Sequence, residues 1–303
     1  MKAVRVNEYG GPEALSYEDI EKPVPSSKEA LVKINASGIN YIDTYQRSGL
    51  YQVPLPTTLG LEAAGIIEEV GDEVSRYAKG DRVAYTSVPG AYAEYATVPE
   101  EKLVKLSDGV SFNEGAAAML QGCTAHYLCK STYHVKEGDS CLIHAAAGGV
   151  GLLLIQMVKN AGGYVIGTVS TDEKAKLAKA AGADEVILYS EQDFETEVNR
   201  ITEGEGVNVV YDSVGKVTFQ ASMNSLRPFG TLVTFGNSSG PVEPFSPSIL
   251  GPKGSLYVTR PTLATHIATR ALLLDGADSL FKLVENGTLK IVSNQTFKLD
   301  EIN

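Results

Sequence analysis

The chain has 303 residues, of which 43% are hydrophobic and 21% charged. This composition is typical of folded globular proteins, and the length predicts about two domains. Acidic residues number 37 against 26 lysines and arginines, a formal net charge of −11, which argues against a nucleic-acid partner. No apolar run reaches the roughly 18 residues of a membrane span. Three cysteines without metal-type spacing favour a reduced, cytoplasmic protein.

The first hundred residues read as short strands separated by glycines, as in a small barrel. The clearest strands are Ala30–Asn35, Ala64–Val70 and Asp81–Tyr85. After Ser111 the apolar residues recur every three or four positions. This spacing predicts helices over Asn113–Leu120 and Thr124–Lys130, and it indicates a domain boundary.

Between Ser140 and Thr259 strands and helices alternate, which predicts a parallel sheet with helices on both faces. The predicted strands are Cys141–Ala145, Tyr164–Val169, Glu185–Leu188, Val207–Tyr211, Thr231–Phe235 and Ser255–Val258. Gly182 follows a lysine-rich helix and is expected to end it in the left-handed conformation. Further on, a helix is predicted over Thr265–Glu285 and a strand over Leu289–Val292.

The most informative stretch runs from Cys141 to Ile155. It passes from a buried strand through a turn of small residues, with the spacing Ala145-x-x-Gly148-x-x-Gly151, into an apolar helix. Small residues let the backbone approach a dinucleotide's pyrophosphate, and the N–H groups that begin a helix can donate to it. Alanine stands where the common fingerprint has its first glycine. The alternative is a tight turn without a ligand.

The end of the second strand of this series indicates which dinucleotide binds. An acid there holds the adenine ribose of NAD, whereas Tyr164–Val169 is followed by Ser170, Thr171 and then Lys174. A hydroxyl and an ammonium group suit the 2′-phosphate of NADPH. Asp172 and Glu173 leave NADH as the alternative, although acids are also favourable in the first turn of a helix.

Several motifs together resemble a known family. They are Gly60–Gly65, Gly80–Val83, Ala147–Gly151, Gly236–Gly240 and Tyr257–Pro261. Over essentially its whole length the chain resembles the zinc-free NADPH:quinone oxidoreductases, the zeta-crystallin-like branch of the medium-chain dehydrogenase/reductase superfamily. The resemblance implies an α/β protein with a GroES-like β-barrel catalytic domain (1–121 and 260–303) and a doubly wound Rossmann NADPH-binding domain (122–259). The cofactor would lie in the cleft between them.

The same resemblance implies that the protein holds no metal. Asn40 and Leu61 stand where zinc alcohol dehydrogenases of the superfamily place a cysteine and a histidine ligand, and no cysteine precedes Cys123. An amide and an alkyl side chain cannot replace a thiolate and an imidazole. Quinones are electron-poor and need less polarisation than alcohols or carbonyls, so the expected activity is zinc-independent quinone reduction. The histidines at 126, 134, 144 and 266 are interpreted as packing or surface residues.

The resemblance also implies site residues. Asn40, Tyr45 and Tyr51 are the candidate catalytic hydrogen-bond donors, with Asp43 orienting them. The alternative is that the tyrosines pack and Asp43 caps a helix over Ile42–Arg47. The implied cofactor-binding residues are Asn40, Thr124, Ala147, Gly148, Gly149, Val150, Gly151, Ser170, Lys174, Tyr189, Phe235, Gly236, Ser238 and Arg260.

Some of these residues have a second interpretation. Phe235 is equally well explained as a core strand residue. Cys141 is expected to be an inert buried residue, whereas Cys123 is a candidate for modification by electrophiles.

Two alternative functions stay open, and the resemblance also implies an assembly. One alternative is an enal or enone double-bond reductase, and another is a redox-weak protein that binds NADPH for structural or sensing purposes. The strand at Ser255–Thr259 is expected to pair with its copy in a homodimer. Family members usually continue past the position of Asn303, which favours the interpretation that this sequence is incomplete.

Overall fold

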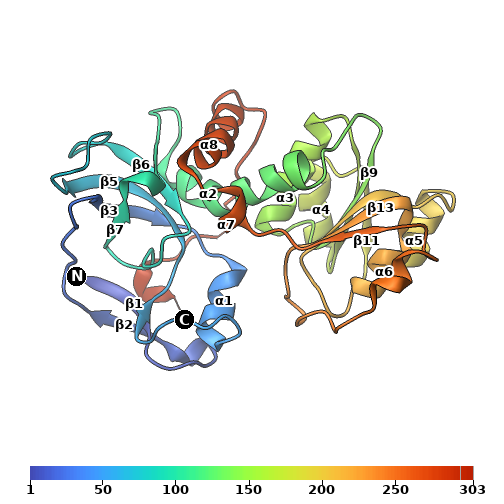
Figure 1. The fold of residues 1–303 in the computed structure, drawn as a ribbon, viewed down its shortest axis with the longest axis horizontal. Coiled ribbons are helices and arrows are strands. Elements are labelled where there is room, and N and C mark those ends of the chain that lie inside the picture. Colours follow the sequence, from blue (N-terminus) through green and yellow to red (C-terminus); the bar gives the residue numbers. More distant parts are fainter. Residues whose placement is uncertain (294, 303) are drawn as a thin grey trace. The chain divides into compact units, whose positions relative to one another are not determined.

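The computed structural model describes residues 1–293 and 295–302, which divide into two compact units (Figure 1). The first unit comprises Met1–Cys123, Ile267–Gly287 and the described part of Ile291–Asn303. The second comprises Thr124–His266 and Thr288–Lys290. The first unit therefore contains two segments from the C-terminal part of the chain.

The first unit is built on two antiparallel sheets. A five-stranded sheet has the order β7-β3-β5-β6-β8, and a three-stranded sheet has the order β2-β1-β4. Alternate residues of the larger sheet point into a core that includes Val32, Ile67 and Tyr85. The strands are β1 (Lys2–Val6), β2 (Leu15–Asp19), β3 (Glu29–Ser37), β4 (Thr57–Thr58), β5 (Glu62–Val70), β6 (Arg82–Thr86), β7 (Tyr95–Pro99) and β8 (Leu103–Lys105).

The helices of this part of the chain differ from the sequence prediction in their limits. One continuous helix, α2 (Phe112–Tyr127), replaces the two predicted there, and the two units divide within it. The predicted helix at Thr265–Glu285 is two helices, α7 (Leu263–His266) and α8 (Arg270–Glu285). The Thr269 hydroxyl begins α8 by accepting the Leu272 N–H. This N-cap makes α8 a separate helix.

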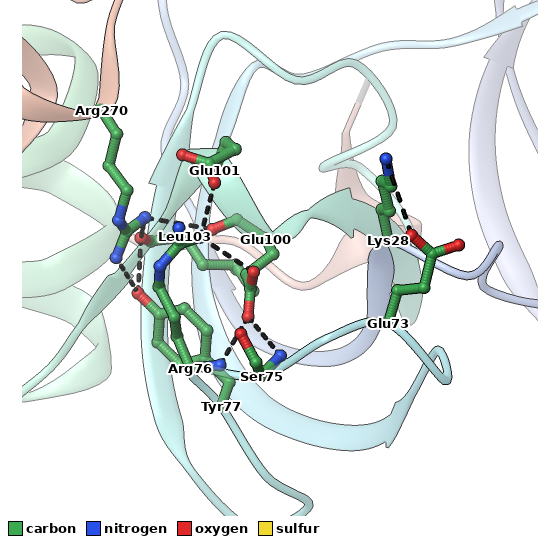
Figure 2. A network of polar contacts seen from close by, with 9 residues as sticks. All are labelled: Lys28, Glu73, Ser75, Arg76, Tyr77, Glu100, Glu101, Leu103 and Arg270. Atoms are coloured by element: carbon green, nitrogen blue, oxygen red, sulfur yellow. Dashed lines mark hydrogen bonds and ion pairs between the residues drawn. The ribbon is translucent and has the colours of Figure 1, made fainter.

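Arg270 joins α8 to the barrel-like sheet of the first unit (Figure 2). Its guanidinium donates to the carbonyl oxygens of Glu100 and Leu103 at 3.1 and 3.0 Å, and to the Tyr77 hydroxyl at 3.0 Å. Beside it, Arg76 contacts the Glu100 carboxylate at 2.8 Å. The C-terminal helix is thus fixed to the first unit by a planar cation that satisfies several acceptors at once.

The second unit is a six-stranded parallel sheet with the order β11-β10-β9-β12-β13-β14. In chain order this is 3-2-1-4-5-6, the doubly wound arrangement whose direction of winding reverses between β9 and β12. The strands are β9 (Ser140–Ile143), β10 (Tyr164–Val169), β11 (Glu185–Leu188), β12 (Val207–Asp212), β13 (Leu226–Thr234) and β14 (Tyr257–Thr259). The predicted fold class is confirmed.

Helices flank this parallel sheet, with α3 beside α4 and α5 beside α6 (Figure 1). They are α3 (Gly149–Asn160), α4 (Asp172–Ala180), α5 (Phe194–Ile201) and α6 (Phe219–Asn224), whereas α1 (Tyr41–Ser48) belongs to the first unit. The strands between them are apolar along their length because helices cover them, as Leu142, Ile166 and Val210 illustrate. In the described part of the chain, every helix is too short or too polar to cross a membrane.

Two local predictions have clear outcomes. Gly182 lies just beyond α4 with φ +110°, so the left-handed position is confirmed. The strand predicted at Leu289–Val292 is wrong. The Gln156 side chain exchanges two hydrogen bonds with the backbone of Lys290, at 2.8 and 3.1 Å, and so takes the place of a neighbouring strand.

Candidate functional site

The turn between β9 and α3 presents backbone donors at the start of a helix. α3 begins at Gly149 with Gly148 as its N-cap, so Gly149, Val150 and Gly151 are its first three residues. Their N–H groups have no partner within the helix and lie at the positive end of its dipole. Gly148 and Gly149 are exposed and Ala147 is half-buried. The turn can therefore accept an anion of the size of a pyrophosphate.

This turn requires a glycine at position 151. A Cβ there would lie 2.5 Å from the Ala145 carbonyl oxygen and 2.7 Å from that of Ala146. The close approach folds the turn back over the first turn of α3. The predicted strand Cys141–Ala145 ends early, at Ile143, because Ala145 has a left-handed φ of +50°.

A second cluster lies at the end of β10, where the three predicted adenosine-phosphate residues come together. The Lys174 ammonium donates to the Ser170 hydroxyl at 3.1 Å, and the Tyr189 N–H donates to the Val169 carbonyl at 3.1 Å. Tyr189 is 54% exposed. A cation, a hydroxyl and an accessible phenol ring at one strand end suit a phosphate monoester.

The two acids near this cluster belong to the start of α4. Thr171 is the N-cap, and Asp172 and Glu173 follow in the first turn. The Glu173 carboxylate accepts from its own N–H and from the Thr171 hydroxyl, which lowers its pKa. The capping interpretation of these acids therefore has a structural basis.

The loops after β12 and β13 are in close contact and share backbone hydrogen bonds. The Phe235 N–H donates to the Asp212 carbonyl at 2.8 Å, and a Cβ at Gly236 would lie 2.2 Å from the Ser213 carbonyl oxygen. Phe235 lies one residue beyond β13 and is half-buried. Its neighbour Ser238 is exposed.

Arg260 follows β14 and meets the end of β13. Its guanidinium donates to the Gly236 carbonyl at 2.9 Å and to the Thr234 hydroxyl at 3.2 Å. Arg260 therefore fixes the backbone next to the loop that begins at Phe235. Thr124, the remaining predicted cofactor residue of this unit, is buried on α2.

In the first unit, Asn40 is the N-cap of α1 and its amide is held from both ends. Nδ2 donates to Glu62 Oε1 at 2.7 Å, and Oδ1 accepts from Gln121 Nε2 at 3.1 Å. In this arrangement the Asn40 nitrogen faces Glu62 and the Asn40 oxygen faces the Gln121 amide. One N–H of Nδ2 lies outside both bonds, so Asn40 can act as an oriented donor.

Asp43 helps to fix the backbone of Asn40. Its Oδ2 accepts the Asn40 N–H at 2.8 Å and the Tyr92 hydroxyl at 2.5 Å, while its buried Oδ1 has no hydrogen-bond partner. Burial raises the pKa of Asp43 to about 6, against the lowering effect of the two hydrogen bonds. Asp43 is therefore part of the α1 cap.

Glu62 is fully buried and joins Asn40 to α2. Its other oxygen, Oε2, accepts the N–H of Leu120, and a Cβ at Gly38 would lie 2.2 Å from Oε1. Burial raises the pKa of Glu62 to about 8, with a smaller raising effect from the nearby Asp43 charge. Hydrogen bonds from Asn40 and Leu120 work in the opposite direction.

The tyrosines of the predicted set form a separate group of rings. The ring centroids of Tyr45 and Tyr51 are 5.1 Å apart, and those of Tyr41 and Tyr45 are 5.3 Å apart. The Tyr51 N–H donates to the Tyr45 carbonyl at 3.0 Å, which folds the segment after α1 back onto the helix. The structure thus pairs Asn40 with Asp43 and Tyr45 with Tyr51.

Sequence reasoning missed three polar residues around Asn40: Glu62, Gln121 and Tyr92. Glu62 stands inside the Gly60–Gly65 motif, which was used only for the resemblance. The others give no local signal, because Gln121 is 81 residues from Asn40 and Tyr92 is 49 from Asp43.

Two further predictions concerned metal ligands and the reactivity of Cys123. Among residues 1–293 and 295–302 no three His, Cys, Asp or Glu side chains are grouped to hold a metal ion. Leu61 is a buried apolar residue. Cys123 is buried, which raises its pKa to about 12, and a buried thiol of this kind is a poor nucleophile toward electrophiles.

Comparisons with known proteins agree with this architecture. The family model for the alcohol dehydrogenase GroES-like domain matches residues 26–108, and that for zinc-binding dehydrogenase matches residues 149–269. These matches and the fold define a dehydrogenase or reductase with a GroES-like unit and a doubly wound unit.

Three individual relatives indicate which family of this superfamily the chain belongs to. A quinone oxidoreductase of Pseudomonas aeruginosa is 50% identical over 302 residues, which cover 99% of this chain and 93% of that protein. The crystal structure of Escherichia coli quinone oxidoreductase complexed with NADPH matches with a TM-score of 0.94 and 44% identity, over 97% of this chain and 90% of that one. A 2-haloacrylate reductase from a Burkholderia species is 40% identical over 99% of this chain and 93% of that protein. The chain belongs to the quinone oxidoreductase family of the medium-chain dehydrogenase/reductase superfamily.

Gly151→Ala tests the geometry of the turn. The added Cβ collides with two carbonyl oxygens, so we expect the free energy of unfolding to fall by about 1–3 kcal/mol. Gly109→Ala is the matched control, because a Cβ there meets no atom closer than 3.6 Å. Urea unfolding measures both variants, and an equal stability of the two would contradict the proposed close approach.

Glu62→Gln tests the buried carboxylate. Because folding raises the pKa of Glu62 from 4.5 to about 8, the folded state binds more protons than the unfolded chain in this range. The free energy of unfolding should therefore fall as pH rises from 5 to 8, by at most about 1.4 kcal/mol per pH unit.

The variant should lose this decline between pH 7 and 8, which lies above the pKa of about 6 of Asp43. Glu69→Gln, an exposed change on the same strand, should keep the wild-type slope. Denaturant unfolding at several pH values gives the slopes. A wild-type stability that rises over this interval is the contrary result.

Proposed function

We propose that this protein catalyses NADPH-dependent reduction of quinones. The observation that carries the proposal is the Gly148–Gly151 turn, whose close packing against Ala145 presents the first N–H groups of α3. The Ser170, Lys174 and Tyr189 cluster at the next strand end supports NADPH over NADH. Relatives named quinone oxidoreductase, one of them crystallised with NADPH, support the same reaction.

The residues of the second unit have separate roles in this proposal. The turn Ala147, Gly148, Gly149, Val150 and Gly151 binds the pyrophosphate. Ser170, Lys174 and Tyr189 hold the 2′-phosphate, with the lysine neutralising its charge. Thr124, Phe235, Gly236, Ser238 and Arg260 line the nicotinamide end. The rigid pairing of the loops after β12 and β13 suits this task, because a positioned ring needs a fixed backbone.

The residues of the first unit act on the acceptor. Bound NADPH would supply the reducing equivalents. Asn40 donates its remaining N–H, and Tyr45 and Tyr51 provide further donors, where negative charge develops on a quinone oxygen. Asn40 also contacts the cofactor. Asp43 orients Asn40 through its backbone.

The proposed reaction does not use zinc. Leu61 has no ligand atom, and the Asn40 amide is held by Glu62 and Gln121, so these two positions do not form a tetrahedral N/S site. A quinone accepts hydride without Lewis-acid polarisation because the charge is delocalised onto its oxygens. Alcohol oxidation lacks this advantage.

A double-bond reductase is the second candidate. The 40% identity to a 2-haloacrylate reductase favours it, and such a reaction would use the same NADPH turn. A redox-weak protein that only binds NADPH is a third, non-enzymatic alternative.

We propose three further properties. The GroES-like catalytic domain comprises 1–121 and 260–303, and the NADPH domain comprises 122–259. Two copies pair through Ser255–Thr259, where β14 is the edge of the six-stranded sheet and Tyr257 is 61% exposed. The protein is cytoplasmic, in keeping with three buried free cysteines.

An acceptor panel tests the activity. Initial rates with NADPH are measured by loss of nicotinamide absorbance, using 1,4-benzoquinone, a 2-alkenal and 2-chloroacrylate. We expect the quinone to have the highest kcat/KM. A higher value for either alkene would favour the double-bond reductase, and tight NADPH binding without turnover would favour the non-enzymatic alternative.

Lys174→Ala tests the cofactor assignment. Loss of a charge-assisted contact with the 2′-phosphate should raise the KM for NADPH about tenfold or more, while the KM for NADH stays nearly unchanged. Lys176→Ala is the control, an exposed lysine on the same helix. Equal losses with both nucleotides would count against the proposed role of Lys174.

A further inference from the structure

A buried polar network lies directly behind the phosphate-binding turn. His144 Nδ1 is 2.9 Å from the Thr168 hydroxyl, and His144 Nε2 is 2.9 Å from the Ser222 hydroxyl. Ser222 in turn donates to Asp212 Oδ2 at 2.9 Å. All four side chains are at most 2% exposed. The sequence interpretation of His144 as a packing residue does not explain why so many polar atoms are buried together.

The hydrogen bonds determine where the protons lie. Asp212 accepts from the N–H groups of Val214 and Gly215 at 2.8 and 2.9 Å, and from the Thr218 hydroxyl, so it acts as an acceptor for all its neighbours. Ser222 has one proton and gives it to Asp212, so His144 Nε2 must donate to Ser222. Thr168 then donates to Nδ1 of a neutral ring. Burial lowers the pKa of His144 and agrees with this form.

The network holds a strained residue in place. Ala145 follows His144 with φ +50°, a conformation that costs energy for a residue with a Cβ and persists only where neighbours enforce it. The His144 N–H donates to the Tyr211 carbonyl and the Ala146 N–H to the Thr168 carbonyl, both at 3.1 Å. Residues on both sides of Ala145 are therefore fixed to β12 and β10.

The same network reaches the other cofactor loops. Asp212 shapes the loop after β12, where Lys216 N–H bonds the Gly240 carbonyl at 3.1 Å and Ser239 Oγ bonds the Val214 carbonyl at 2.8 Å. One buried cluster thus links the ends of β9, β10, β12 and β13. These ends surround the point where the sheet reverses its direction of winding.

We infer that His144, as a neutral imidazole protonated on Nε2, is a positioning residue that holds Ala145 in its left-handed conformation and so pre-forms the turn for a dinucleotide pyrophosphate. This inference rests on the proposed NADPH binding at that turn. His144 does not touch the cofactor. It acts through Ala145 and through Asp212, on either side of the switch point.

Nuclear magnetic resonance of the ¹⁵N-histidine-labelled wild-type protein tests the tautomer without cofactor or turnover. We expect one histidine ring with a protonated Nε2 and an unprotonated Nδ1, and this ring should not titrate between pH 5 and 8. Its signals should be missing from the His144→Phe spectrum. In the Ser222→Ala spectrum no ring should show this tautomer without titrating. An Nδ1-protonated or titrating His144 ring would overturn the inference.

Cofactor affinity tests the positioning. His144→Phe keeps a ring against Phe194, which lies edge-on at 4.8 Å, but removes both nitrogens. The Kd for NADPH, measured by fluorescence titration, should rise at least about fivefold, since a small misplacement of positioned groups costs up to about 10²-fold. His134→Phe, on the surface, should keep the wild-type Kd. A smaller change in a folded His144→Phe protein would overturn the role.

A double-mutant cycle with Ala145→Gly tests whether His144 affects NADPH binding through Ala145. Glycine adopts positive φ without strain, so His144→Phe should weaken NADPH binding by a smaller factor in the Ala145→Gly background than in the wild type. An equal factor in both backgrounds would show that His144 does not act through Ala145. Wild-type protein that binds no NADPH would instead refute the proposed function and leave the tautomer result standing.

Discussion

The close approach of the Gly151 backbone to the carbonyl oxygens of Ala145 and Ala146 is the contact on which the cofactor site depends. It lets the chain leave β9 and enter α3 within a few residues, so that the first N–H groups of the helix face outward from the end of the sheet. Any side chain at this position would separate the strand from the helix. Ala145 adopts a strained conformation as a consequence, and the His144 network behind it is arranged to hold that conformation.

The first unit depends on a different constraint, the burial of the Glu62 and Asp43 side chains, for which no ion pair is found among the described residues. Glu62 and Asp43 each have a raised pKa because burial outweighs their hydrogen bonds. This arrangement lowers stability near neutral pH, and such costs are common where a side chain must be held in one orientation for function. Here the oriented group is Asn40, whose amide would otherwise be free to rotate and to exchange its donor and acceptor ends.

The fold followed from periodicity and from one motif, but the site followed only in part. Alternation of strands and helices correctly gave the parallel sheet, because helices cover its apolar strands. The helix limits near Ile267–Thr269 and the strand at Leu289–Val292 were wrong, because a threonine cap and a glutamine side chain decided them rather than apolar spacing. Glu62, Gln121 and Tyr92 were missed, and the polar partners of His144 were not foreseen, because these contacts join residues far apart in sequence and spacing carries no information about them.

The account's central claim is that the amides at the start of α3 bind the diphosphate of NADPH. Backbone amide resonances of Gly149, Val150 and Gly151, followed while the nucleotide is added, test it most directly. The account predicts large shifts at these three residues on saturation, with NADPH bound more tightly than NADH. Binding that shifts amides elsewhere and leaves these three unmoved would contradict it.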